Sequence, residues 1–150
     1  PHMMTVKDIA YRINAGGFKM VITDRDNMAK VDEVAAECPH LQLRMVVDDN
    51  PLERLSSPWI GYQHELKYPA PVSTKLVATA GRKVLATDPM LIYFTSGTTK
   101  DPKMVLHDYG HPLGQTVTAK FWHDLTDKDV HFTVSDTGWA KCGWGKLYGQ

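Results

Sequence analysis

Apolar residues recur at alternating helical and strand intervals over the first fifty positions. Thr5 and Asp8 have the spacing of a helix N-terminal capping box, and Gly16-Gly17 supplies a helix end. The continuous apolar centre of residues 18–23 predicts a strand, residues 28–37 fit a second helix, and residues 41–47 predict a further strand. Strands that alternate with helices in this way indicate βα units around a parallel sheet, and therefore an α/β fold.

The pattern is less regular from residue 48 to residue 87, where prolines interrupt every long periodic run. Residues 59–68 fit a short helix, because Trp59, Tyr62 and Leu66 would share one side. Residues 75–87 are compatible with either a strand or a helix. A connection of this length is typical either of a functional segment or of a boundary between subdomains, and the sequence leaves both open.

The apolar pattern becomes regular again at Met90. Residues 90–94 and 104–107 predict two strands that flank a polar loop, which would place the loop at an exposed tip. Asp108 is a candidate N-cap for a helix over residues 109–122. A strand over residues 131–135 and a helix over residues 140–148 complete the expected elements.

Composition narrows the class of protein. The chain has 150 residues, of which 17 are basic and 17 acidic, and 43% are hydrophobic. Nothing in this balance suggests the clustered positive charge of a nucleic-acid-binding domain, and the hydrophobic content argues against disorder. No apolar run approaches the ~20 residues that a membrane-spanning helix needs. Cys38 and Cys142 suggest neither a disulfide framework nor a zinc site, which favours a reducing, cytoplasmic compartment. We expect residues 1–4 to be a cloning scar and start.

The loop between the two later strands carries the most specific chemistry. Backbone N–H groups, hydroxyls and an ammonium group are suited to binding a polyphosphate, and glycine allows close backbone approach. The same residue types also dominate ordinary polar hairpin tips, which is the simpler explanation. The whole string, which follows an apolar strand and ends in Pro-Lys, favours a phosphate site over a simple hairpin tip. The candidate phosphate-binding residues are Thr95, Ser96, Gly97, Thr98, Thr99, Lys100, Asp101, Pro102 and Lys103.

This loop resembles the phosphate-binding signature T-S-G-T-T-G-x-P-K of the adenylate-forming enzymes, the superfamily of acyl-CoA synthetases and firefly luciferase. With x free, the chain matches eight of the nine positions, and Lys100 replaces a glycine. If that glycine has a positive φ, lysine costs roughly 1–2 kcal/mol there. Four further segments resemble the medium-chain and acetyl-type acyl-CoA synthetases, namely residues 5–12, 34–39, 103–107 and 135–139.

The resemblance implies a two-step ligase. A carboxylic acid and ATP, with Mg²⁺, would give an acyl-adenylate and pyrophosphate, and coenzyme A would then displace AMP. It also implies that the chain is a truncated part of the large N-terminal domain, with three αβα layers and a mostly parallel sheet. Within it, residues 5–50 would form βα units, 51–88 an irregular connection, and 89–150 the phosphate-loop and acyl-pocket segment. The isolated fragment would be inactive.

Late aromatic residues are candidates for the acyl pocket. Trp139 corresponds to a family position at which an aromatic residue borders that pocket, although large aromatics more often fill a core. The candidate set is Gly138, Trp139, Trp122, Lys141 and Trp144. His107 follows the loop at a family position and is a candidate for orienting it. His107 and His111 are four residues apart, but the expected helix boundary separates them. We therefore expect no metal site made by protein side chains alone. The expected metal is the Mg²⁺ that accompanies ATP.

Two alternatives to the synthetase stay open. The chain could belong to an adenylating domain with an acceptor other than coenzyme A, or to a non-catalytic nucleotide-binding or interaction module. A truncated sheet would expose edges and apolar faces, so we also expect the fragment to self-associate.

Overall fold

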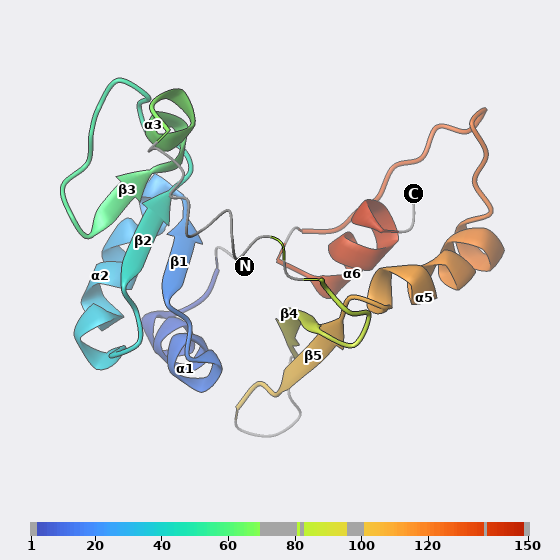
Figure 1. Cartoon of the computed structure of the whole chain (residues 1–150), viewed down its shortest axis with the longest axis horizontal. Coiled ribbons are helices and arrows are strands. Elements are labelled where there is room, and N and C mark those ends of the chain that lie inside the picture. The colour runs from blue at the N-terminus through green and yellow to red at the C-terminus, as the bar shows by residue number, and fades with distance from the viewer. Residues whose placement is uncertain (1–2, 70–80, 82, 96–100, 137, 149–150) are drawn as a thin grey trace. The chain divides into compact units, whose positions relative to one another are not determined.

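The computed structural model describes residues 3–69, 81, 83–95, 101–136 and 138–148, which form two compact units, His2–Gly81 and Arg82–Gln150. The first unit is a parallel sheet with helices, and the second contains an antiparallel hairpin and helices (Figure 1). The protein is therefore a mixed α/β structure, as the alternating pattern predicts.

Helix α1 (Val6–Gly16) begins and ends where the sequence predicts. The Asp8 N–H donates to Thr5 Oγ1 at 3.2 Å, and the Thr5 N–H donates to Asp8 Oδ2 at the same distance. Gly17 ends the helix with φ +58°, a conformation that glycine adopts without a steric penalty. Local rules alone define this element.

Three parallel strands follow, in the order β1–β2–β3. The predicted βα units are confirmed by β1 (Met20–Thr23) and β2 (Leu43–Val46). Between these strands run the 3-10 turn η1 (Arg25–Asn27), helix α2 (Met28–Val34) and the 3-10 turn η2 (Ala35–Glu37). The second predicted helix, over residues 28–37, thus ends as a 3-10 turn.

The predicted helix over residues 59–68 is wrong in its first part. Trp59–Gly61 forms strand β3, which pairs with β2, and only Tyr62–Lys67 forms a helix, α3. Burial alone would raise the pKa of Asp49. The N–H groups of Gln63 and His64 donate to its carboxylate at 2.8 and 3.0 Å, which leaves the pKa below its ordinary value. The Asp49 carboxylate thus accepts from two backbone N–H groups in the first turn of α3.

The core lies between the sheet and helices α1 and α2. One cluster contains Ile13, Val34 and Cys38, and another contains Val31, Val46 and Trp59. Val21 of β1 packs against both clusters. Side chains alternate between the faces of a strand, so the opposite face of the sheet carries other apolar residues. These include Ile22, which is 60% exposed, and Leu43, which is 46% exposed.

A hydrogen-bonded group joins α2 to the two later strands. Trp59 Nε1 donates to Asp32 Oδ1 at 2.9 Å, and Arg44 Nη1 lies 2.6 Å from the same oxygen. Asp32 therefore satisfies the indole N–H of a largely buried tryptophan while it pairs with a cation.

The second unit is built on a hairpin. Strands β4 (Pro89–Phe94) and β5 (Met104–Asp108) pair antiparallel, so the expectation of a mostly parallel sheet applies only to the first unit. Helix α5 (His111–Thr118) continues into the π-helical turn η3 (Ala119–His123). The short helix α6 (Ala140–Cys142) and the π-helical turn η4 (Gly143–Leu147) confirm a helical segment over residues 140–148.

Two expectations for this unit are wrong. Asp108 is the last residue of β5 rather than a helix N-cap: its Oδ1 accepts from the Gly110 N–H at 3.0 Å, and Gly110 is the N-cap of α5. The predicted strand over residues 131–135 is irregular, and Phe132 is 85% exposed. A strand needs a neighbour for its backbone groups, and no described strand pairs with this segment.

Candidate functional site

The hairpin β4–β5 carries the predicted phosphate-binding loop, residues 95–103, which we call the hydroxyl loop. The Thr95 N–H donates to the Lys103 carbonyl oxygen at 2.9 Å, and the Lys103 N–H donates to Thr95 Oγ1 at 3.2 Å. These two bonds close the base of the loop, and both side chains are exposed. Residues 96–100, which include Ser96, Gly97, Thr98, Thr99 and Lys100, lie outside the described residues.

The described ends of the hydroxyl loop fit an anionic ligand. Lys103 brings an exposed ammonium group to the end of the loop, next to the half-buried Pro102. The carboxylate of Asp101 is also exposed, so it can remain in solvent rather than face a phosphate. The hairpin thus holds the ammonium group of Lys103 beside the backbone bonds that join Thr95 and Lys103.

His107 lies on β5 and packs against the hairpin and α5. Its ring meets the Tyr93 ring edge-on, with 5.9 Å between centroids, and its Nδ1 lies 3.1 Å from Nδ1 of His111. Burial raises the pKa of Tyr93, with smaller contributions from Tyr148 and Cys142. The structure therefore joins two histidines that the sequence assigned to separate elements.

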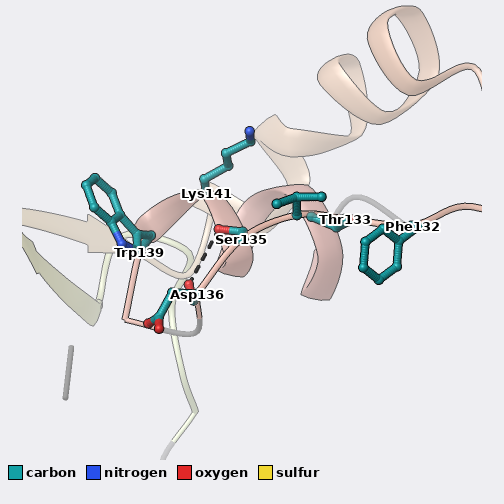
Figure 2. Close-up of a pocket in the computed structure, with 7 residues that line it drawn as sticks. Phe132, Thr133, Ser135, Asp136, Trp139 and Lys141 are labelled. Carbon is teal, nitrogen blue, oxygen red and sulfur yellow. Dashed lines mark hydrogen bonds between the residues drawn. The ribbon is translucent and has the colours of Figure 1, made fainter. Parts of the chain in front are cut away.

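A hollow of about 530 Å³ opens along the irregular segment before α6 (Figure 2). Figure 2 shows the Trp139 indole and the Phe132 ring at its two ends, with Lys141 and Asp136 extending in opposite directions. Of the predicted pocket candidates, the structure brings Trp139 and Lys141 together here. The lining residues are Phe132, Thr133, Val134, Ser135, Asp136, Trp139 and Lys141.

Asp136 shapes the turn that leads into α6. Its Oδ1 accepts from the Gly138 N–H at 2.7 Å, and its carbonyl oxygen accepts from the Trp139 N–H at 3.0 Å. Gly138 therefore contributes to the turn that presents Trp139 and is not part of the lining. Phe132 is a lining residue that the sequence did not single out, because its alternating neighbours matched an ordinary strand.

The remaining pocket candidates are not brought to the hollow. Trp122 lies in η3, is 82% exposed and does not line it. Trp144 belongs to η4, and its side chain lies outside the described part of the chain.

No group of three or more His, Cys, Asp or Glu side chains within the described residues is placed to hold a metal ion. Cys38 and Cys142 are free thiols, and burial raises the pKa of Cys38. None of the helices in the described ranges combines the length and the apolar character needed to cross a membrane.

Comparison with known proteins places this geometry in a family. The family described as AMP-binding enzyme matches residues 2–148. The chain belongs to the AMP-binding enzyme family. The human protein named acyl-coenzyme A synthetase ACSM5, mitochondrial, is 38% identical over 143 residues, which are 94% of this chain and 23% of that protein. The mouse protein named acyl-coenzyme A synthetase ACSM3, mitochondrial, is also 38% identical, over 97% of this chain and 23% of its own length.

Two solved structures have a similar fold. An acyl-CoA synthetase from Brucella canis has a TM-score of 0.74 and 22% identity, over 98% of this chain and 25% of that one. The luciferase-like enzyme from the nonluminescent mealworm Zophobas morio has a TM-score of 0.68 and 17% identity, over 99% of this chain and 32% of its own. The chain thus spans about a quarter to a third of the length of these proteins, and 23% of the length of the two mammalian relatives.

Proposed function

We propose that this chain is an internal part of the N-terminal domain of an ATP-dependent acyl-CoA synthetase. The observation that carries the proposal is the hairpin whose base is closed between Thr95 and Lys103 around the T-S-G-T-T-K-D-P-K string. The names of the two mammalian relatives support the same activity. In this reading Lys103 binds ATP phosphates, together with the hydroxyls and backbone N–H groups of residues 95–99.

The reaction follows from the charges involved. A carboxylate oxygen attacks the α-phosphorus of ATP, the bond to the β-phosphate oxygen breaks, and pyrophosphate leaves. The thiol of coenzyme A then attacks the acyl carbon of the acyl-adenylate, and AMP leaves. Both the nucleophile and ATP are anionic, so neutralising and aligning the phosphates is the main requirement of the first step. Mg²⁺ bound with ATP would supply further positive charge.

A pyrophosphate-release assay of the full-length protein tests this proposal. Short, medium and aromatic carboxylic acids are compared, with coenzyme A added in a second series. Pyrophosphate release with acid and ATP, followed by AMP and acyl-CoA formation, is the expected result. Release without acyl-CoA would favour a different acceptor, and absence of release would favour a non-catalytic module. The 150-residue chain alone is expected to be inactive.

Trp139 is proposed to limit the length of the acyl chain. It stands at one end of the hollow, opposite Phe132, where its indole occupies space that a longer substrate would need. We expect Trp139→Ala in the full-length enzyme to shift the preference towards bulkier acids by about 10-fold or more, since one or two methylenes in an apolar pocket are worth that much. Trp122→Ala is the matched control, and the same chain-length profile in wild type and Trp139→Ala would contradict the role.

We propose that the isolated chain self-associates. The open sheet face carries the exposed side chains of Ile22 and Leu43, and Val47, which follows β2, is exposed as well. Contact between two such faces would remove apolar area from water. Size-exclusion chromatography with light scattering should show dimers or larger species that become more abundant with concentration. A monomer at every concentration would contradict this expectation.

The compartment is a separate proposal. Two free cysteines are compatible with a reducing cytoplasm, whereas the printed names of the mammalian relatives place those proteins in mitochondria. Fractionation of cells that express the full-length protein would decide between the two.

A further inference from the structure

His107 and His111, the histidine pair, join strand β5 to helix α5. His107 lies near the end of β5 and pairs with Leu91 of β4, whereas His111 is the first residue of α5. The turn between them brings the two Nδ1 atoms to 3.1 Å and the two ring centroids to 4.1 Å. At this distance the two nitrogens share a hydrogen bond, so one of them carries the proton and the other accepts it.

Gln115 decides which nitrogen carries it. Its Nε2, which can only donate, lies 3.4 Å from Nε2 of His111. His111 Nε2 must then accept, which places the proton of a neutral His111 on Nδ1. His111 Nδ1 therefore donates to His107 Nδ1, and His107 carries its own proton on Nε2. The bonds run in one direction, from Gln115 through His111 to His107.

We propose that this directed chain is an acid-sensitive link that holds α5 on the hairpin and so steadies the base of the hydroxyl loop. A first proton enters His111 at Nε2 and ends its acceptance from Gln115, but the Nδ1–H of the charged ring still donates to His107. A second proton must enter His107 at Nδ1, where it faces the Nδ1–H of His111. Two donors cannot share a hydrogen bond, so the link then breaks. The inference concerns the hairpin itself and does not depend on nucleotide binding.

The surroundings of the pair favour the neutral state of His107. Burial lowers its pKa, the neighbouring His111 lowers it further, and the carboxylate of Asp108 opposes both. Tyr93 of β4 packs against the His107 ring. A histidine with a lowered folded pKa takes up its proton more readily when unfolded. The contribution of neutral His107 to the free energy of unfolding is therefore fully present above the ordinary histidine pKa of about 6.5. It is lost as the pH drops from there through the pKa of the folded state.

The link reaches the hydroxyl loop through β5. His107 lies near the end of β5, and Lys103 directly precedes the first residue of that strand. There the Thr95 N–H donates to the Lys103 carbonyl oxygen. Release of α5 from the end of β5 should therefore increase opening of the ladder up to this bond. Amide hydrogen exchange of Thr95 reports the opening directly.

Nitrogen-15 NMR of the histidine rings and amide exchange of the 150-residue chain test the inference. At pH 7.5 we expect an Nδ1–H tautomer for His111 and an Nε2–H tautomer for His107. After correction of the measured rates for intrinsic exchange, protection of the Thr95 amide should fall about 3-fold to 10-fold between pH 7.5 and pH 5. This factor corresponds to the net free energy of one hydrogen bond.

Two variants separate the link from ordinary packing. His111→Asn keeps a side-chain amide near the position of Nδ1 that can either donate or accept, so protection should persist at pH 5. His111→Leu removes the bond, so protection should already be low at pH 7.5. His131→Leu, an exposed histidine of the same unit, should behave as wild type. Identical tautomers in the pair, or wild-type protection in His111→Leu at both pH values, would overturn the inference.

Discussion

Replacing Trp59 by alanine should destabilise the first unit by about 3–5 kcal/mol, the usual cost of removing a buried tryptophan side chain. Trp59 is 7% exposed and belongs to the cluster that contains Val31 and Val46. Its loss leaves a cavity at the edge of the sheet and also removes the indole donor to Asp32. Urea unfolding of the 150-residue chain, followed by far-UV circular dichroism and by amide exchange of β2, measures the effect.

Two variants make this prediction specific. Trp59→Phe keeps most of the ring and loses only the N–H bond to a carboxylate, so about 1–3 kcal/mol should be lost. Trp122→Ala removes an equally large side chain that is 82% exposed, so its effect should stay within about 0.5 kcal/mol. Equal losses for Trp59→Ala and Trp122→Ala would show that Trp59 is not a core residue. The phenylalanine variant keeps the comparison measurable if the alanine variant does not fold.

Local sequence rules were sufficient where the determining contacts are close in the chain. The capping box at Thr5 and the left-handed Gly17 define α1, and the continuous apolar centre of residues 18–23 marks β1. Strand β3 depends on a distant partner instead. Trp59 has helical spacing with Tyr62 and Leu66, but pairing with β2 and burial of the indole decide its conformation. A three-residue strand carries too little pattern to show this in the sequence.

The wrong strand over residues 131–135 has the opposite cause. The segment alternates polar and apolar residues, as a half-buried strand does, but an alternating pattern produces a strand only where a neighbour accepts its hydrogen bonds. Phe132 and Trp139 contribute to a hollow instead. The turn at Asp136 leads from that segment to Trp139, and the resemblance of residues 135–139 to the family did not reveal this turn.

Candidate site residues were predictable to the extent that a motif is contiguous. The hydroxyl loop was found from its string of residue types, and the structure describes its two ends at Thr95 and Lys103. The contact between His107 and His111 was missed, because it depends on the turn between β5 and α5 and on a helix whose N-cap is Gly110 rather than Asp108. Histidines four residues apart across a turn were the available signal.

The largest functional effect is expected at Lys103. In the full-length enzyme, Lys103→Met should lower the rate of acyl-adenylate formation by about 100-fold or more, the usual result of deleting one group that stabilises developing charge. The exposed ammonium stands at the closed base of the hydroxyl loop, and its backbone N–H and carbonyl group are both bonded to Thr95. Those backbone bonds do not involve the side chain, so the substitution removes the charge and leaves the hairpin paired. Acid-dependent pyrophosphate release measures the rate.

The control variants distinguish charge from structure. Lys103→Arg keeps the positive charge but presents it as a planar fork, so an intermediate rate is expected. Lys7→Met removes one exposed lysine from α1 and should leave the rate unchanged. If Lys103 acts on the phosphates, the loss in Lys103→Met should also appear as weaker ATP binding at unchanged protection of the Thr95 amide. Wild-type rates in Lys103→Met would exclude a phosphate contact, and a loss of rate together with lost amide protection would assign the lysine a structural role in the hairpin.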